Sequence, residues 1–213
     1  MKPHAGQMVL QQGVALSQAR AAMVMIHGRG SSADSILGLQ AALEVDGIAY
    51  RAPQAEGGSW YPLPFMSPIK KNEPGISSAL WVIGEVLRSF ENAGIPRHKC
   101  MLLGFSQGAC LVLEYAARYP CRYGAVFGLS GGLIGPAGTE WKVNGSLDAT
   151  PVFLGCSDID LHIPKTRVQE TSRFMRQIGA DVTERLYPGM PHTVNNDEVN
   201  FVQSVMQNVI DAP

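Results

Sequence analysis

The chain has 213 residues, of which 46% are hydrophobic and 16% charged, and its formal net charge at pH 7 is −1. This composition favours a folded domain with a sizeable core over a disordered chain, and the lack of a strongly basic segment argues against a nucleic-acid partner. No apolar run approaches the ~20 residues of a membrane span, and residues 1–7 lack the apolar region of a signal peptide.

Apolar runs of strand length alternate along the chain with segments of helical periodicity. A short leading strand or hairpin is expected over residues 9–15. The later predicted strands are 21–26, 47–51, 100–104, 123–129, 150–155 and 182–187. The predicted helices are 33–43, 75–92, 109–118, 164–178 and 196–210. This alternation predicts one α/β domain over residues 1–213, with a mainly parallel sheet and helices on both faces.

Residues 54–74 break this pattern. The segment is rich in proline and aromatic residues and has no clear periodicity. Loops of this length inside a compact domain are often functional. The alternative is an ordinary loop whose aromatic side chains pack onto the core.

The four cysteines show no Cys-x-x-Cys spacing. They are Cys100, Cys110, Cys121 and Cys156, in or beside predicted core elements. We expect buried free thiols in a reducing compartment, and therefore a cytoplasmic protein.

The motif Gly104-Phe105-Ser106-Gln107-Gly108 joins a predicted strand to a predicted helix. Strand, tight turn and helix form the context of a nucleophile elbow, in which the serine hydroxyl stands clear of the sheet. The pentapeptide alone fits equally well a glycine-containing turn with an incidental serine. A nucleophilic serine also needs a base, an acid and an oxyanion hole.

Candidate partners follow the later strands, at the sheet edge where ligands bind. Asp158 and Asp160 come after strand 150–155, and His192 comes after strand 182–187. The order serine, aspartate, histidine is that of α/β-hydrolases. His192 is the best candidate base, because it lies in a loop at this edge, just before a helix.

The other histidines are weaker candidates for the base. His98 precedes a strand, at the opposite edge, and His4 lies in a terminus that we expect to be loose. His27 is expected to be structural, and His162 to line the pocket.

With these pieces in place, the chain resembles the phospholipase/carboxylesterase family, the bacterial carboxylesterases and acyl-protein thioesterases of the α/β-hydrolase superfamily. The matching segments are Ile26-His27-Gly28-Arg29-Gly30, Ser59-Trp60-Tyr61, Gly94-Ile95-Pro96, the elbow motif, residues 158–164 and Gly189-Met190-Pro191-His192. The resemblance implies an α/β-hydrolase fold with a minimal or absent cap domain. It also implies a serine carboxylesterase that hydrolyses small to medium esters through an acyl-enzyme on Ser106. An acyl-protein thioesterase or lysophospholipase is the alternative, and a non-catalytic binding protein on the same fold is a third.

The family pattern also bears on the acid. Aligned without gaps to Pro164, it places the triad carboxylate at Asp160 and leaves Asp158 to brace the loop. Counting three residues from Gly155 selects Asp158 instead, so both stay open, with Asp160 preferred.

The oxyanion hole is expected to use two backbone N–H groups. One belongs to Gln107, the residue after the nucleophile, and the other to the loop of residues 27–30. By resemblance that second donor is Arg29, where the family usually has leucine. Its guanidinium either meets an anionic part of the substrate or pairs with a carboxylate or solvent.

Apolar residues of the two loops that border the active site in this family are expected to bind substrate. They are Trp60, Tyr61, Leu63, Phe65, Leu133 and Ile134. Their character predicts an uncharged, hydrophobic bound group. The expected partner is a small ester or thioester. No metal or cofactor is expected, because no cluster has ligand spacing. A homodimer is left open.

Overall fold

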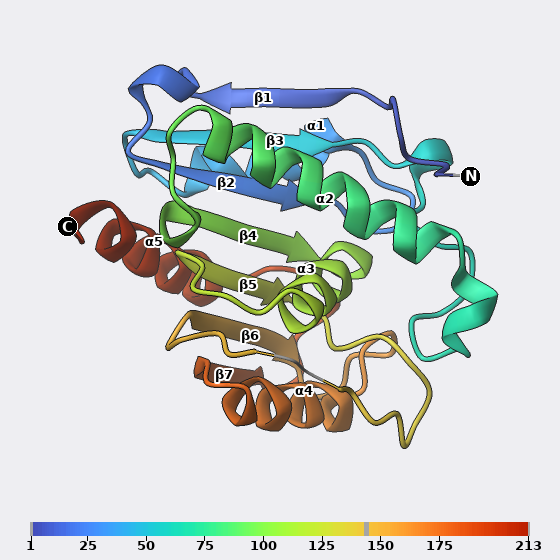
Figure 1. The fold of residues 1–213 in the computed structure, drawn as a ribbon. Helices are drawn as coiled ribbons and strands as arrows, with labels where there is room; N and C mark the ends of the chain where they lie inside the picture. The colour runs from blue at the N-terminus through green and yellow to red at the C-terminus, as the bar shows by residue number, and fades with distance from the viewer. Residues whose placement is uncertain (1, 143–144, 213) are drawn as a thin grey trace.

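The computed structural model describes residues 2–142 and 145–212. Its centre is a seven-stranded sheet in the order β1-β3-β2-β4-β5-β6-β7 (Figure 1). The strands are β1 Val9–Gly13, β2 Ala21–Ile26, β3 Ile48–Pro53, β4 Cys100–Phe105, β5 Ala125–Leu129, β6 Pro151–Ser157 and β7 Asp181–Tyr187. Strand β1 pairs antiparallel with β3, and every other neighbouring pair is parallel.

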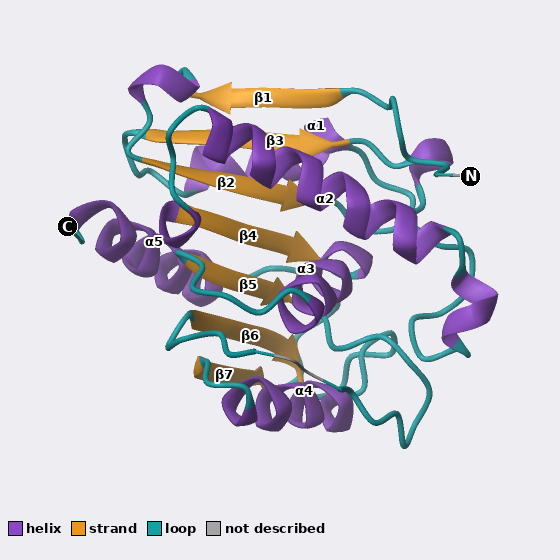
Figure 2. Cartoon of the chain, viewed as in Figure 1, coloured by secondary structure: helices purple, strands orange, loops and turns teal. Residues whose placement is uncertain are grey.

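Helices cover both faces of the sheet (Figures 1 and 2). The α-helices are α1 Ala33–Leu37, α2 Gly75–Asn92, α3 Gln107–Arg118, α4 Lys165–Gln177 and α5 Asn196–Asp211. Short 3₁₀ helices span Leu16–Gln18, Gly38–Ala42, Glu56–Gly58, Ile69–Asn72 and Arg97–Lys99. Helices α2, α3 and α4 pack on one face and α1 and α5 on the other, so each face has its own apolar core. The predicted α/β-hydrolase architecture is therefore confirmed, with no large cap among the described residues. The predicted domain range of 1–213 includes residues 1, 143–144 and 213, which lie outside them.

The central strands are buried on both faces, which explains their continuous apolar sequences. All residues of β2 and β5 are buried, as are the first five of β4. A strand in a parallel sheet between two helical layers has no solvent-facing side, so an alternating pattern is not expected. The predicted strand 21–26 and helix 75–92 match the observed bounds.

Two helix predictions differ from the structure by two residues or more at one end. The predicted helix 33–43 is α-helical only to Leu37 and continues as a 3₁₀ turn from Gly38, because glycine has low α-helix propensity. Helix α3 begins at Gln107, two residues before the predicted start. The elbow motif thus passes directly from Ser106 into the helix.

The parallel arrangement brings the carboxyl ends of β2, β4, β5, β6 and β7 to one edge of the sheet. The loops that leave these ends carry the predicted catalytic residues. Within the described ranges, no helix combines the length and apolar character needed to cross a membrane.

Candidate active site

Ser106 occupies a sharp turn between β4 and α3. Its backbone has φ 55° and ψ −116°, a strained region for a residue with a Cβ atom. The turn is held by the Ser106 N–H, which donates to the Leu129 carbonyl at 2.9 Å, and by the Cys110 N–H, which donates to the Ser106 carbonyl at 3.1 Å. Strain that the surrounding structure enforces is a common feature of functional sites.

The two glycines of the motif allow the strand and helix to approach. A Cβ atom on Gly104 would lie 2.3 Å from the carbonyl carbon of Gly108, and one on Gly108 would lie 2.0 Å from the Ile26 carbonyl oxygen. Both obstacles are backbone atoms, so no side-chain movement could relieve the clash. The spacing of these glycines around Ser106 is therefore required by the geometry of the turn.

Three predicted residues meet in a hydrogen-bonded chain. The Ser106 Oγ lies 2.9 Å from Nε2 of His192, and Nδ1 of His192 lies 2.6 Å from Oδ2 of Asp160. An ionised carboxylate only accepts hydrogen bonds, so Nδ1 carries the proton. In the neutral ring Nε2 then accepts from the Ser106 hydroxyl, the arrangement that general-base catalysis requires.

Asp160 is held as a carboxylate. Its side chain has no exposed surface. Its Oδ1 accepts from the N–H groups of His162 at 2.8 Å and Ile163 at 3.0 Å. Burial raises the pKa of Asp160, but the hydrogen bonds from His192 and these two N–H groups outweigh it, and the pKa lies below its usual range.

Asp158 has a different partner. Its Oδ1 accepts from the Gly189 N–H at 2.9 Å, and its own N–H donates to the Tyr187 carbonyl at 3.1 Å. Asp158 therefore ties the loop after β6 to the loop that carries His192. Of the two aspartates that the sequence left open, only Asp160 contacts the imidazole.

The loop of residues 27–30 lies against the elbow. A Cβ atom on Gly28 would be 3.4 Å from the Ser106 Cβ atom. Within residues 2–142 and 145–212, the backbone N–H groups of Arg29 and Gln107 have no hydrogen-bond acceptor. Two unused donors beside a serine hydroxyl are suited to an oxyanion.

His27 and His4 form hydrogen bonds to the loop of residues 54–74. The His27 Nδ1 bonds to the Gly28 carbonyl at 2.8 Å, and its Nε2 accepts from the Ala55 N–H at 3.1 Å. The prediction of a loose terminus around His4 is wrong. His4 is only 3% exposed, because its ring bonds to the Trp60 carbonyl at 2.8 Å and to the Glu56 N–H at 3.1 Å.

The Gln107 side chain has a role that the sequence reasoning missed. Its Oε1 accepts from the Trp60 N–H at 2.8 Å, and its Nε2 donates to the Tyr61 carbonyl at 2.9 Å. The residue after Ser106 thus fixes the loop of residues 54–74 as well as offering its N–H. No sequence signal links positions 107 and 60.

A cavity of about 450 Å³ opens beside Ser106. Its lining consists of Arg29, Tyr61, Pro62, Pro64, Phe65, Ser106, Gln107, Cys110, His162, Ile163 and His192. Of the predicted substrate-binding residues, Tyr61 and Phe65 line this cavity. Leu63 does not line it and is 37% exposed.

Trp60, Leu133 and Ile134 are instead fully buried, and none of them lines the cavity. Trp60 is drawn inward by its backbone bond to Gln107 and by its indole N–H, which donates to the His27 carbonyl at 3.0 Å. They belong to the same apolar core cluster as Tyr61 and Phe65 of the cavity wall.

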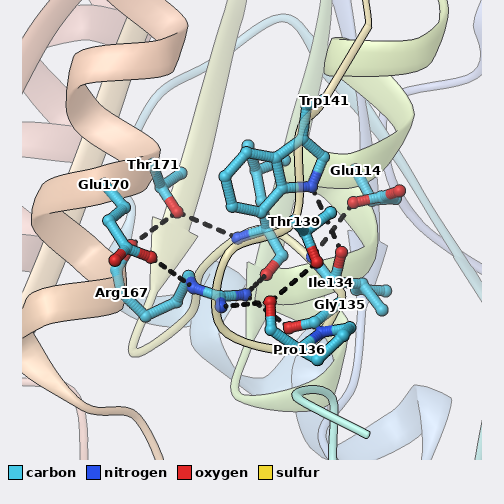
Figure 3. A network of polar contacts seen from close by, with 10 residues as sticks. Glu114, Ile134, Gly135, Pro136, Thr139, Trp141, Arg167, Glu170 and Thr171 are labelled. Atoms are coloured by element: carbon cyan, nitrogen blue, oxygen red, sulfur yellow. Dashed lines mark hydrogen bonds and ion pairs between the residues drawn. The ribbon is translucent and has the colours of Figure 1, made fainter. Parts of the chain in front are cut away.

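A buried arginine holds the segment of residues 133–136 (Figure 3). Arg167, on α4, is 1% exposed and donates to the carbonyls of Leu133 at 2.8 Å, Gly135 at 2.7 Å and Pro136 at 3.1 Å. The Gly135 N–H in turn donates to the Phe65 carbonyl at 2.9 Å. Through these bonds, α4 positions a residue of the cavity wall.

Side chains from α3 and α4 also bind N–H groups of residues 133–136. The Leu133 N–H donates to the Thr171 hydroxyl at 2.9 Å, and the Ile134 N–H donates to the Glu114 carboxylate at 3.0 Å (Figure 3). Burial raises the pKa of Glu114, and its bonds to Arg118 and Ile134 oppose this. The N–H groups of Leu133 and Ile134 are thus bound by side chains from α4 and α3, and the Gly135 N–H by the Phe65 carbonyl.

The Arg29 guanidinium is bonded to the loop of residues 54–74. It donates to the carbonyls of Pro62 at 2.9 Å and Leu63 at 2.8 Å, and to the Ser59 hydroxyl at 3.2 Å. The sequence prediction of a carboxylate or solvent partner did not include these carbonyl groups. Among the described residues, no group of three or more His, Cys, Asp or Glu side chains could hold a metal ion.

Known proteins are similar to this chain in fold and in sequence. A family model described as Phospholipase/Carboxylesterase matches residues 14–210. A solved structure from Dyadobacter fermentans, described as a phospholipase/carboxylesterase, is 40% identical and has a TM-score of 0.91, covering 95% of this chain and 97% of that one.

More distant relatives carry thioesterase names. Acyl-protein thioesterase 1 of Candida albicans is 26% identical, over 92% of this chain and 94% of its own. The structure of Zea mays acyl-protein thioesterase 2 is 20% identical with a TM-score of 0.73, over 96% and 99% of the two chains, and shows the shared fold. The match to residues 14–210 confirms the predicted resemblance, and the chain belongs to the phospholipase/carboxylesterase family of α/β-hydrolases.

Proposed function

We propose that this chain is a serine carboxylesterase that hydrolyses small to medium carboxylic esters through an acyl-enzyme on Ser106. The observation that carries the proposal is the pair of hydrogen bonds that His192 makes, at 2.9 Å to the Ser106 hydroxyl and at 2.6 Å to the Asp160 carboxylate. A strained elbow beside two free N–H groups adds the geometry that acyl transfer needs.

In the proposed reaction, the Ser106 oxygen attacks the ester carbonyl while Nε2 of His192 takes its proton. Asp160 accepts from Nδ1–H and stabilises the imidazolium that forms. The tetrahedral intermediate then expels the alcohol, which receives that proton, and leaves an ester between Ser106 and the acyl group. Water attacks this ester by the same route and releases the acid and Ser106.

The N–H groups of Arg29 and Gln107 would stabilise the oxyanion of each intermediate. Loss of one such donor typically costs about 10²–10³ in rate. Both are backbone groups, so the arginine found where the family usually has leucine leaves the donor in place.

The alternative is an acyl-protein thioesterase or lysophospholipase. The name of the Candida albicans relative supports the thioesterase reading. We prefer short to medium esters because Arg29 and His162 contribute polar groups to the cavity wall. A long acyl chain would cover these groups without offering them a hydrogen bond. A non-catalytic role is disfavoured because a serine, a histidine and an aspartate are all present and hydrogen-bonded to one another in sequence.

We also propose that the reaction uses neither a metal nor a cofactor and that the protein is cytoplasmic. The four cysteines are free, as is usual in a reducing compartment.

A series of p-nitrophenyl esters from acetate to palmitate tests the substrate class. We expect kcat/KM to be highest for short or medium chains and to be lost in Ser106→Ala. A maximum at palmitate, or faster cleavage of a matched acyl thioester than of the oxygen ester, would contradict the proposal and favour the alternative.

A further inference from the structure

The cavity wall carries one fixed positive charge. Arg29 is exposed and lines the cavity beside Ser106. Its bonds to two carbonyls and one hydroxyl hold the guanidinium in place without neutralising it. An arginine has five N–H donors in a planar fork, and these contacts use three of them. Donors therefore remain for a ligand.

No acidic side chain balances this charge. Among residues 2–142 and 145–212, no carboxylate oxygen lies within 4.0 Å of the Arg29 guanidinium nitrogens, and no aspartate or glutamate lines the cavity. Asp160 is buried behind His192, and Asp158 is bonded to Gly189. The other ionisable side chains on the wall are Tyr61, Cys110, His162 and His192. Burial raises the pKa of Tyr61 well above its usual range and that of Cys110 to about 12.

The charge is close to the reaction centre by its covalent structure. The proposed oxyanion donor and the guanidinium belong to the same residue. When the carbonyl oxygen of a substrate faces the Arg29 N–H, a substituent a few bonds from that carbonyl lies about one arginine side chain's length, or less, from the guanidinium. Guanidinium binds carboxylate in a paired, planar geometry.

We propose that the preferred esters of this enzyme carry a carboxylate a few bonds from the scissile carbonyl, and that the Arg29 side chain binds it. This inference rests on the proposed function and narrows its substrate class. It replaces the expectation of an uncharged, hydrophobic bound group, because Trp60, Leu133 and Ile134, which supported that expectation, lie outside the cavity wall.

The test compares esters that differ in one charge. Methyl hydrogen glutarate and dimethyl glutarate place the carboxylate or its neutral ester on the acyl side. The anion 4-acetoxybenzoate and its methyl ester do the same on the alcohol side. For wild type we expect kcat/KM to be higher for the anion in at least one pair, and the advantage to shrink as ionic strength rises.

Arg29→Met should lower the anion-to-neutral ratio of kcat/KM in that pair by about tenfold. Arg29→Lys should lower it less, because lysine keeps the charge but not the planar fork. Arg173→Met, which removes an exposed arginine on α4, should leave the ratio unchanged. Free glutarate should inhibit wild type competitively, a readout that does not depend on the fold of any variant.

Equal ratios in wild type and Arg29→Met, or a wild-type preference for the neutral ester in both pairs, would overturn the inference while leaving the esterase proposal intact. Failure of wild type to hydrolyse any of the four esters or phenyl acetate would overturn both. Phenyl acetate carries no charge, so its hydrolysis reports on the proposed function alone.

Discussion

The two sides of the cavity are built in different ways. On the elbow side, β4 and α3 meet through backbone atoms, and Gly104 and Gly108 leave no room for a side chain. On the opposite side, the loop of residues 54–74 is held by polar side chains from distant parts of the chain, including His4, Arg29 and Gln107. Close backbone packing leaves a glycine signature within five residues, whereas long-range hydrogen bonds leave no local pattern.

The largest expected effect is on the elbow side. Gly108→Ala forces a Cβ atom to within 2.0 Å of the Ile26 carbonyl oxygen, so α3 must move away from β2. We expect a loss of about 4 kcal/mol in the free energy of unfolding, or failure to fold, together with loss of esterase activity. Urea denaturation followed by circular dichroism measures the first. Gly38→Ala is the matched control, because a Cβ atom there meets nothing within 4 Å. Equal stability of the two variants would contradict the packing argument.

The two aspartates near His192 should differ in their effect on turnover. Asp160→Asn removes the carboxylate that orients the imidazole and should lower kcat by about 10³–10⁴. Asp158→Asn keeps an oxygen that can accept from the Gly189 N–H, and should lower kcat by less than about tenfold. Steady-state kinetics on p-nitrophenyl acetate compare the two, and a larger loss for Asp158→Asn would contradict the assignment of Asp160.

The loop side depends on the Gln107 side chain. Gln107→Met keeps the backbone N–H but leaves the Trp60 N–H and the Tyr61 carbonyl without partners. We expect a loss of about 2 kcal/mol in stability and a rise in KM that exceeds the fall in kcat, since the loop that forms the wall loosens. Gln107→Glu, which keeps the acceptor for Trp60, should recover part of both. A fall in kcat at unchanged KM would show that the side chain acts on the chemical step instead.

The last expected effect is a pH dependence of stability that arises at Glu198, in the first turn of α5. Glu198, on α5, is fully buried, one of its oxygens has no partner among the described residues, and burial raises its pKa to about 7. In the unfolded chain the pKa is about 4.3, so the native state binds more protons between these two values. The stabilisation present below pH 4.3 is therefore lost as the pH rises through 7.

Glu198→Gln cannot ionise and should lack this loss. Relative to wild type it should gain about 2 kcal/mol of stability between pH 5 and pH 8, measured by urea denaturation at both values. Glu44→Gln, at an exposed position, is the control and should show no such pH-dependent gain. A Glu198→Gln difference from wild type that is the same at both pH values would contradict the titration.

Much of the elbow side could be predicted from the sequence. Uninterrupted apolar runs such as 21–26 indicate strands buried on both faces, and the parallel sheet then brings Ser106, Asp160 and His192 to one edge. The sequence left two aspartates open because both fit the spacing after β6. The structure separates them by their partners, His192 for Asp160 and Gly189 for Asp158.

The loop side could not be predicted to the same depth. Residue character placed Trp60, Leu133 and Ile134 in the pocket, but apolar side chains favour the core and the cavity wall alike. The choice depends on backbone bonds such as those of Gln107 to Trp60 and of Arg167 to Leu133. These bonds join residues more than 30 positions apart, and periodicity carries no information about them.

The most direct test of the central claim is covalent labelling of Ser106. Wild type and Ser106→Ala, both shown to be folded by circular dichroism, would be treated with a fluorophosphonate probe and analysed by intact mass and peptide mapping. We predict a single adduct on Ser106 in wild type and none in Ser106→Ala. An unlabelled wild type, or equal labelling of both proteins, would contradict the assignment of Ser106 as the nucleophile.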